Sequence, residues 1–527
     1  MKTKKLMLAS SLLLISVVAV SQNFPKFDVT YCRADWNMSP DAMYINGSVC
    51  THFVPIESDA KVIDFDLASN LNVDRIVGKD GNLQYIRSGN KVIVNLPNKL
   101  KEGKKDSLTI FYHGTPVSTG YGSFKINAYH HTLWTLSESF GAKDWWPCRQ
   151  NFYDKIDSMD IYVTCPSKYS VASNGVLVSD VPVGSAHTVH YKEHHLINHY
   201  MVGVAVGVYN EHRDKFLLKN DRIIELVDYV WPSTNYPSNN LKYTADLLDM
   251  YSGYYGPYPY VDEKYGHAQI GWSGGIEHQT MTFLYDFDPV VEAHELAHQW
   301  FGNYVTCKGW SNIWINEGFA SYSEYLAIEQ FYFGDTTRWK EYKLAGALNS
   351  QYSICVKDTT NMDVIFDQST TYDKGGLALQ MLRNEIGTNA FFKGCRYILQ
   401  NYAEGFASID DARQCFEMAA DTSLQEFFNN WIYGIGYPIY NVGYSQNENN
   451  EVQLILNQTT IHSSVKFYAM HPTIRLVGET QTKDVRIYNT EQGQKFIIPV
   501  DFKVTEVIFD PDKNILCKSE VFSSINN

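Results

Sequence analysis

The sequence predicts a multidomain α+β protein, and three observations support this fold class. The chain has 527 residues, whereas a single hydrophobic core stops growing at roughly 250 to 300 residues. Hydrophobic residues make up 44% and charged residues 19% of the chain, as in folded globular proteins. Alternating apolar residues, typical of strands, dominate both ends of the chain, and apolar residues at helical spacing dominate its middle third.

The first 21 residues are typical of a secretory signal peptide. Three lysines within the first five residues precede an apolar run over residues 6–20, and small residues follow at a cleavage site after Ser21. An uncleaved membrane anchor is the alternative, but the run is shorter than the roughly 20 residues of a spanning helix. We therefore expect a bacterial protein that is periplasmic or secreted, without stable membrane insertion after signal cleavage.

Residues 22–229 are predicted to form an N-terminal antiparallel β domain. Short alternating runs such as Val62–Phe65, Lys91–Val94 and Ser107–Phe111 follow one another with turn residues between them.

The nine cysteines leave the disulfide question open. Export permits disulfides, but an odd number of cysteines cannot all pair within one chain. Cys32 and Cys50 flank the turn signal Asn46-Gly47 in strand-like sequence, so a cross-strand bridge is one interpretation. Two unpaired small core residues are the other.

Residues 230–437 are predicted to form a mainly helical domain, and residues 438–527 a small C-terminal β-sandwich. In the first, apolar residues recur at helical spacing from residue 241 onward, and in the second, alternation returns in Val452-Leu454-Leu456. After the first helix, we expect further helices near residues 289–302, 317–331, 375–386 and 408–420.

The sharpest chemical signal is a pair of histidines four residues apart in His294-Glu295-Leu296-Ala297-His298. On a helix, this spacing places both imidazoles one turn apart on one face, where they can bind one metal ion. Asp288 is a suitable N-cap, Pro289 suits the first helical position, and Gly302 suits the end of the helix.

A third ligand is expected from the next predicted helix. A catalytic zinc needs three protein ligands and an open position for water. Glu317 stands 19 residues after His298, at the start of a helical stretch. A first-turn glutamate favoured by the helix dipole is the alternative explanation. Together with the histidine pair, Glu317 predicts a site for one Zn²⁺ ion per chain.

Five segments carry a resemblance to a known family. HELAHQW, followed at this interval by NEGFASY, resembles the zinc aminopeptidases of the alanyl aminopeptidase and leukotriene hydrolase family, which are gluzincins. Residues 274–278 resemble that family's Gly-x-Met-Glu-Asn exopeptidase motif, with Ile276 for Met and His278 for Asn. Residues 372–375 resemble its Tyr-x-Lys-Gly segment, and Trp145-Trp146-Pro147-Cys148 resembles a signature of its β domain.

The resemblance implies a thermolysin-like catalytic domain and gives a role in it to each of five residues. His294, His298 and Glu317 would bind zinc, as the spacing already predicts. Glu295 would take a proton from the attacking water and pass it to the leaving amine. Tyr372 would donate a hydrogen bond to the oxyanion of the tetrahedral intermediate.

The resemblance also implies an anchor for the substrate's amino terminus. Glu277 would pair with the free α-ammonium and so make the enzyme an exopeptidase, and Glu138 stands where some members have a second group for that ammonium. Glu324 lies seven residues beyond Glu317 on the same helical face, where it can orient a ligand histidine. The neighbours of Glu277 that are predicted to contact substrate are Gly274, Gly275, Ile276 and His278.

The predicted function is hydrolysis of N-terminal residues from peptides with a free amino terminus. A zinc endopeptidase with an open cleft would share the zinc site but would not need Glu277. A lipid epoxide hydrolase of the same family and a catalytically inactive binding scaffold are further alternatives, although a scaffold usually loses ligands that are all present here.

Two features of the whole chain bear on its partners. Many members of the family continue into a large helical C-terminal domain, whereas only about 90 residues follow Pro438, so we expect a more open site. The chain has 44 basic and 58 acidic residues, a net charge of −14, which disfavours nucleic acid as a partner.

Overall fold

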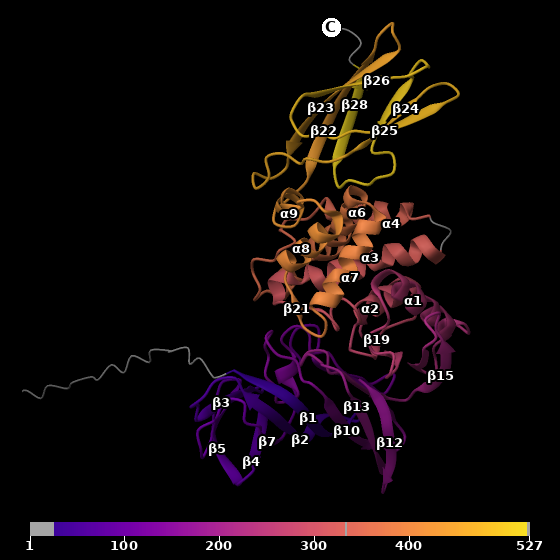
Figure 1. Ribbon diagram of the computed structural model, residues 1–527. Helices are drawn as coiled ribbons and strands as arrows, with labels where there is room; N and C mark the ends of the chain where they lie inside the picture. The colour runs from indigo at the N-terminus through magenta and orange to yellow at the C-terminus, as the bar shows by residue number, and fades with distance from the viewer. Residues whose placement is uncertain (1–25, 332–334, 524–527) are drawn as a thin grey trace, which may run out of the picture.

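The computed structural model describes residues 26–331 and 335–523; the predicted signal peptide, residues 1–21, lies outside them. A β-rich N-terminal region, a helical middle region and a C-terminal pair of sheets follow one another along the molecule (Figure 1). This arrangement confirms the predicted multidomain α+β class. Among the described helices, none is long and apolar enough to cross a membrane.

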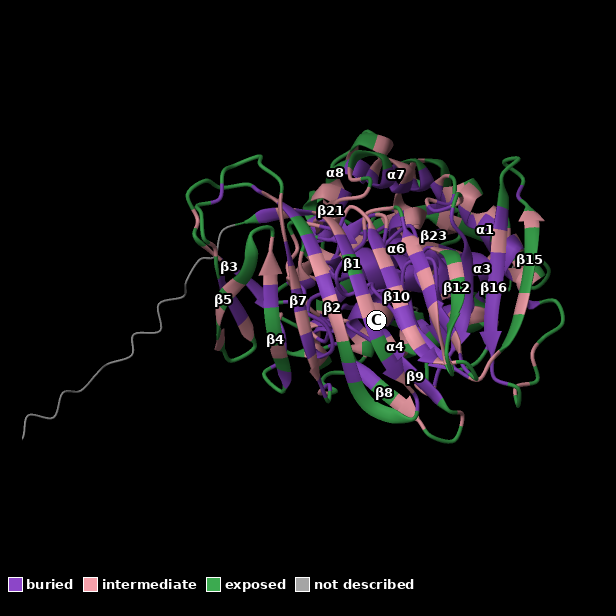
Figure 2. Cartoon of the chain, turned by 90° about the horizontal axis from the view of Figure 1, so that it is seen from below, coloured by how far each residue is buried: buried purple, intermediate pink, exposed green. Residues whose placement is uncertain are grey.

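A ten-stranded sheet forms most of the N-terminal region, in the order β12-β13-β10-β1-β2-β7-β4-β5-β6-β3. Its neighbours are antiparallel, as predicted, except for the parallel pair β1 and β10. Buried residues alternate with less buried ones along β1 and β10 (Figure 2), because one face of the sheet covers the core. The strands are β1 (Phe27–Ser39), β2 (Ala42–Pro55), β3 (Val62–Asp66), β4 (Leu71–Gly78), β5 (Gly81–Ser88), β6 (Lys91–Asn95), β7 (Asp106–Gly114), β10 (Met159–Pro166), β12 (Val176–Val183) and β13 (Ala186–Glu193).

The register of β1 and β2 decides between the two interpretations of Cys32 and Cys50. Cys32 pairs with Thr51, and Cys50 pairs with Arg33. Because side chains alternate between the faces of a sheet, the two thiols lie on opposite faces. Cys32 is buried in the core, and both cysteines are free.

A small sheet carries the segment that leads to Glu138. It consists of β8 (Phe124–Asn127), β9 (Thr132–Thr135), β11 (Ser170–Ser173) and β14 (Val204–Gly207), in the order β11-β14-β9-β8. The buried Trp145 donates from Nε1 to Ser137 Oγ (2.9 Å), and its carbonyl accepts from Tyr112 OH (2.8 Å). The Trp-Trp-Pro-Cys segment thereby fixes the residue before Glu138 against the large sheet.

A five-stranded sheet lies between the β region and the helices. Its order is β15-β16-β17-β19-β18, with β15 (Asn210–Leu217), β16 (Ile223–Val230), β17 (Tyr265–Gln269), β18 (Gly275–Ile276) and β19 (Thr282–Leu284). The sheet spans the boundary predicted between residues 229 and 230, and the division of the chain into domains stays a prediction.

The four further helices predicted for the middle region are all present, and α3 packs against both α2 and α6. Helices α4 and α7 were not among the predicted helices. Helix α2 ends at Ala297 rather than near Gly302, because Trp300 N–H bonds to Ala297 O and Asn303 N–H to His298 O, which breaks the regular helical ladder. The helices are α1 (Asn240–Tyr255), α2 (Pro289–Ala297), α3 (Trp314–Phe331), α4 (Thr337–Ala347), α5 (Met362–Ile365), a π-helix (Gln368–Lys374), α6 (Gly375–Ile386), α7 (Thr388–Asn401), α8 (Ile409–Ala420) and α9 (Gln425–Trp431).

The C-terminal region is a β-sandwich, as predicted. A four-stranded sheet, β26-β23-β22-β28, and a three-stranded sheet, β25-β24-β27, enclose a separate apolar core that includes Tyr440, Leu454 and Ile474. From Pro438 to residue 523, the structure contains strands and no helix. The strands are β22 (Pro438–Gln446), β23 (Glu451–Thr460), β24 (Thr473–Val477), β25 (Thr482–Arg486), β26 (Gln494–Pro499), β27 (Glu506–Phe509) and β28 (Lys518–Ser523).

Candidate active site

Helix α2 positions the histidine pair. The Asp288 side chain accepts hydrogen bonds from the backbone N–H groups of residues 290 (2.8 Å) and 291 (3.2 Å), and Pro289 occupies the first turn, as predicted. His298 follows the last helical residue but keeps a right-handed helical conformation (φ −58°, ψ −24°). The rings of His294 and His298 therefore lie on one face, with centroids 4.9 Å apart.

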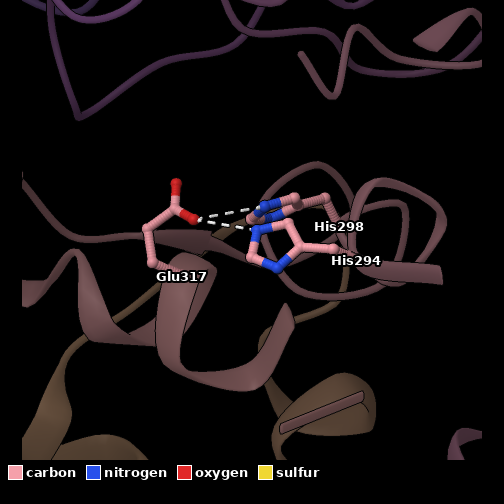
Figure 3. A group of neighbouring side chains, drawn as sticks. All are labelled: His294, His298 and Glu317. Atoms are coloured by element: carbon pink, nitrogen blue, oxygen red, sulfur yellow. Dashed lines mark hydrogen bonds and ion pairs between the residues drawn. The ribbon is translucent and has the colours of Figure 1, made fainter. Parts of the chain in front are cut away.

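Glu317 meets the two histidines from the first turn of α3 (Figure 3). Its Oε2 lies 3.3 Å from His294 Nε2 and 3.4 Å from His298 Nε2. The candidate ligand atoms of all three residues lie within 4.8 Å of one another. The structure thus brings together the three residues that the sequence predicts as ligands.

The outer nitrogens of both imidazoles face acceptors. His294 Nδ1 lies 2.8 Å from Glu324 Oε1, and His298 Nδ1 lies 3.0 Å from Phe301 O. With each Nδ1–H donated to its acceptor, each Nε2 faces the Glu317 carboxylate and, in the neutral imidazole, carries the lone pair that can bind a metal ion. Two imidazole nitrogens and a carboxylate oxygen that converge in this way can bind one cation. Two imidazoles and one carboxylate match the ligand set of a catalytic Zn²⁺ site with an open position.

Glu295 lines the same cavity and depends on a glycine beside it. A Cβ added to Gly275 in β18 would lie only 2.4 Å from Glu295 Cγ and Oε1. Glycine at position 275 therefore allows β18 to lie this close to the Glu295 carboxylate. Burial raises the pKa of Glu295 to about 8, a range that suits a group that accepts and returns a proton near neutral pH.

Glu277 and Glu138 approach the metal ligands from two β segments. Glu277 directly follows β18, Glu138 lies in the loop after β9, and oxygens of both lie within 4.8 Å of each other and of Glu317. Each has a buried Oε1 without a hydrogen-bond partner. Burial raises the pKa of Glu277, and burial together with the Glu277 charge raises the pKa of Glu138 well above its usual range. A cation bound between them would satisfy both carboxylates.

Tyr372 enters the cavity from the π-helix, an element that is frequent at functional sites. Its ring centroid lies 6.1 Å from that of His294. Burial raises the pKa of the Tyr372 phenol well above 10, so its hydroxyl stays protonated and can donate a hydrogen bond.

The residues around Glu277 divide into two groups. Gly274, Gly275 and Ile276 line the cavity, and Gly274 has a positive φ of 120°. His278 is buried and does not line the cavity; its Nε2 lies 3.1 Å from Thr135 O. The structure therefore corrects the predicted substrate contact of His278, because this side chain points back to β9 and connects β18 to the strand that leads to Glu138.

An aromatic wall forms the apolar side of the cavity, which has a volume of about 280 Å³. The Tyr121 ring lies 5.9 Å from Trp272 and 5.8 Å from Phe366, measured between centroids. These three residues are not predictable from the sequence, because they come from three separate loops without periodicity. The one local signal is that Tyr121 stands between Gly120 and Gly122, both with positive φ (57° and 114°).

The fold and the ligand set define the class of protein: a His-Glu-x-x-His metal protein with a downstream glutamate ligand. A protein-family model with the description "Peptidase family M1 domain" matches residues 286–431, which include all three ligands, Glu295 and Tyr372. This segment is therefore similar to peptidase family M1.

Curated relatives align with part of their own length. Aminopeptidase M1-B of Oryza sativa subsp. japonica is 26% identical over 335 residues, covering 58% of this chain and 37% of that protein. Aminopeptidase M1 of Arabidopsis thaliana is 23% identical over 462 residues (79% and 51%), and glutamyl aminopeptidase of Bos taurus is 28% identical over 320 residues (53% and 33%). The chain thus spans about a third to a half of these relatives.

Solved structures share the fold. An M1 zinc metallopeptidase from Deinococcus radiodurans has a TM-score of 0.70 at 24% identity and covers 78% of this chain and 94% of its own. A mutant of that enzyme with a bound Tyr-Ser-Ala substrate has the same TM-score at 23% identity, covering 78% of this chain and 95% of its own.

Proposed function

We propose that this protein is a zinc-dependent aminopeptidase that removes N-terminal residues from peptides. The observation that carries the proposal is the pair of partnerless carboxylate oxygens on Glu138 and Glu277 beside the three-ligand site. A substrate's α-ammonium is the cation that fits between them. Anchored there, a peptide presents its first peptide bond to the metal-binding residues.

Metal binding, proton transfer and stabilisation of the oxyanion are each assigned to residues of this chain. His294, His298 and Glu317 would hold the zinc ion, which would supply Lewis-acid chemistry that makes water acidic enough to lose a proton near neutral pH. Glu295 accepts the proton of the attacking water and returns it to the leaving amine. Tyr372 donates a hydrogen bond to the oxyanion that develops on the scissile carbonyl.

The aromatic wall sets the preferred first residue. Tyr121, Trp272 and Phe366, together with the buried Leu136 and Ile276, form the apolar surface of the cavity. Glu138 lines the same cavity, so a side chain that leaves the anchored α-carbon meets this wall. We propose a preference for large apolar N-terminal residues such as Phe and Leu.

An endopeptidase is the runner-up, and the same two glutamates disfavour it. An internal peptide segment carries no ammonium, so its binding would leave the buried Glu138 and Glu277 oxygens unpaired, at a cost of about 1–3 kcal/mol for each unsatisfied group.

We propose further that the protein is periplasmic or secreted, on the basis of its first 21 residues. Mass determination of the exported chain tests this, with cleavage after Ser21 expected.

Cleavage of a panel of unblocked aminoacyl arylamides tests the proposed function. We expect zinc-dependent release of the arylamine, fastest for Phe and Leu. An active zinc-loaded protein that cleaves only blocked substrates would contradict the aminopeptidase assignment.

A further inference from the structure

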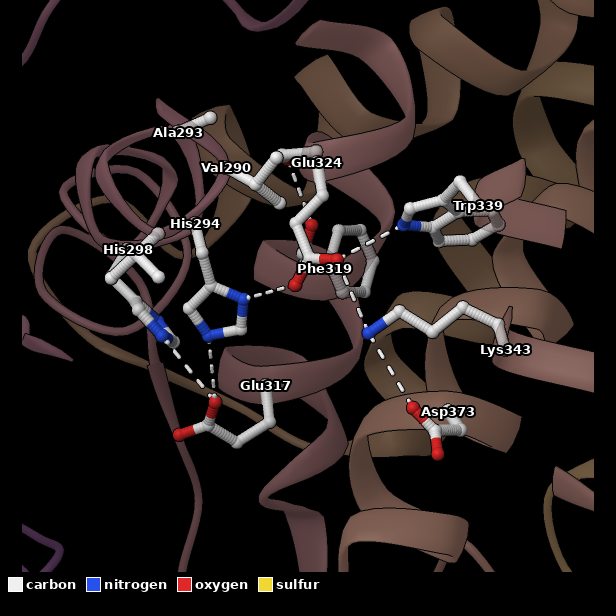
Figure 4. Close-up of polar contacts among 12 residues, drawn as sticks. Val290, Ala293, His294, His298, Glu317, Phe319, Glu324, Trp339, Lys343 and Asp373 are labelled. Atoms are coloured by element: carbon white, nitrogen blue, oxygen red, sulfur yellow. Dashed lines mark hydrogen bonds and ion pairs between the residues drawn. The ribbon is translucent and has the colours of Figure 1, made fainter. Parts of the chain in front are cut away.

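A buried lysine contacts the glutamate that accepts a hydrogen bond from the metal-binding residue His294. Lys343, on α4, is only 4% exposed and lines the wall of the active-site cavity. Its Nζ lies 3.2 Å from Glu324 Oε2 and 3.5 Å from Asp373 Oδ1 (Figure 4). This one ammonium therefore joins two buried carboxylates that belong to different helices.

The first carboxylate leads to the metal site. Glu324 uses Oε1 to accept from His294 Nδ1 (2.8 Å) and Oε2 to accept from Trp339 Nε1 (3.0 Å) and from Lys343. Of these groups, Lys343 is the permanent cation. Its charge balances the glutamate that holds the His294 ring with Nε2 toward Glu317.

The second carboxylate leads to the phenol. Asp373 directly follows Tyr372 in the π-helix, and its Oδ1 also accepts from Gln368 Nε2 (3.1 Å). A Cβ at Gly346 would lie 1.9 Å from Asp373 Oδ2, so the glycine lets this carboxylate reach α4. Lys343 and Gly346, nearly one turn apart on α4, thus hold the segment that carries Tyr372.

We propose that Lys343 is a positioning residue that ties the metal ligand His294, through Glu324, to Tyr372, through Asp373. The expected effect of Lys343 on turnover rests on the proposed function, whereas its expected effect on zinc affinity does not. Removal of the ammonium leaves Glu324 and Asp373 as buried carboxylates without the shared cation that holds them in place, so both side chains lose a fixed position. His294 then loses its fixed orientation, and Tyr372 loses its support.

The first test is zinc affinity, measured by competition with a chelator. Loss of a group that supports a metal ligand typically costs about 10- to 100-fold in affinity, which is the loss expected for Lys343→Met. Lys340→Met is the matched control: Lys340 is a buried lysine on the same helix, but its Nζ donates to Asp512 O (3.0 Å) and Asn514 Oδ1 (2.9 Å), in the C-terminal region. Lys343→Arg keeps the cation and should restore part of the affinity.

The second test separates the two arms of the network. Asp373→Asn removes the charge toward Tyr372 and leaves Glu324 and Lys343 paired. We expect its zinc affinity to stay within about twofold of the wild type, whereas kcat at saturating zinc falls about tenfold or more and KM changes little, because Tyr372 acts on the transition state.

Three outcomes decide the inference. Equal zinc affinities for Lys343→Met and Lys340→Met would overturn it. An unchanged kcat in Asp373→Asn would overturn its second arm, and this test stands even where Lys343→Met fails to fold. If wild-type protein binds zinc and shows the expected affinity loss in Lys343→Met but cleaves no unblocked substrate, the proposed function fails while the link from Lys343 to the metal site holds.

Discussion

Gly275→Ala tests the contact between β18 and Glu295, the proposed general base. The new Cβ would lie 2.4 Å from Glu295 Cγ and Oε1, whereas non-bonded carbon atoms rest at about 3.5–4.0 Å. Either β18 or the Glu295 carboxylate must therefore move by about 1 Å. A misplacement of about 1 Å near the reacting atoms can cost about 100-fold in rate, or about 2.7 kcal/mol.

The assay combines turnover with metal analysis. We expect kcat/KM on an unblocked Phe arylamide to fall about 100-fold while zinc stays stoichiometric, because none of the nearest atoms to the new Cβ belongs to a metal ligand. Gly253→Ala is the control, since this glycine of α1 has nothing within 4 Å of an added Cβ. A Gly275→Ala enzyme that holds zinc and keeps kcat/KM within threefold of the wild type would show that this contact does not position Glu295.

Three further predictions concern single residues. Glu295→Gln should keep stoichiometric zinc and lose most of kcat; a loss below tenfold with full zinc would argue against Glu295 as the base. Glu317→Ala should purify with little zinc and need added metal for activity, and a variant that retains full zinc would point to another third ligand. Phe366→Ala should lower kcat/KM for a Phe arylamide about tenfold relative to an Ala arylamide, and an unchanged ratio would place the first side chain elsewhere.

The sequence predicted the parts of the site that depend on local structure. The cap at Asp288, the spacing of His294 and His298 and the position of Glu317 in a first helical turn are each set by neighbouring residues along one helix. The structure brings these residues together as predicted.

Features that depend on tertiary contacts were missed or left open. Lys343 and Tyr121 reach the cavity from a helix without a strong apolar face and from a loop, so no periodicity marks them. The free state of Cys32 and Cys50 follows from a strand register, which the turn signal between them does not determine. His278 occupies a motif position, but its side chain contacts β9 of the small sheet instead of the cavity.

Aminopeptidase activity is decided by comparing one peptide in two forms, with a free and with an acetylated N-terminus, on zinc-loaded wild-type protein and on Glu277→Ala. Loss of a charge-assisted hydrogen bond worth about 1.5–3 kcal/mol corresponds to about 10- to 150-fold in binding. The wild type should strongly prefer the free peptide and release residues one at a time from its N-terminus, and Glu277→Ala should narrow that preference by about this factor. Equal cleavage of both forms by the wild type would contradict the aminopeptidase assignment and favour an endopeptidase.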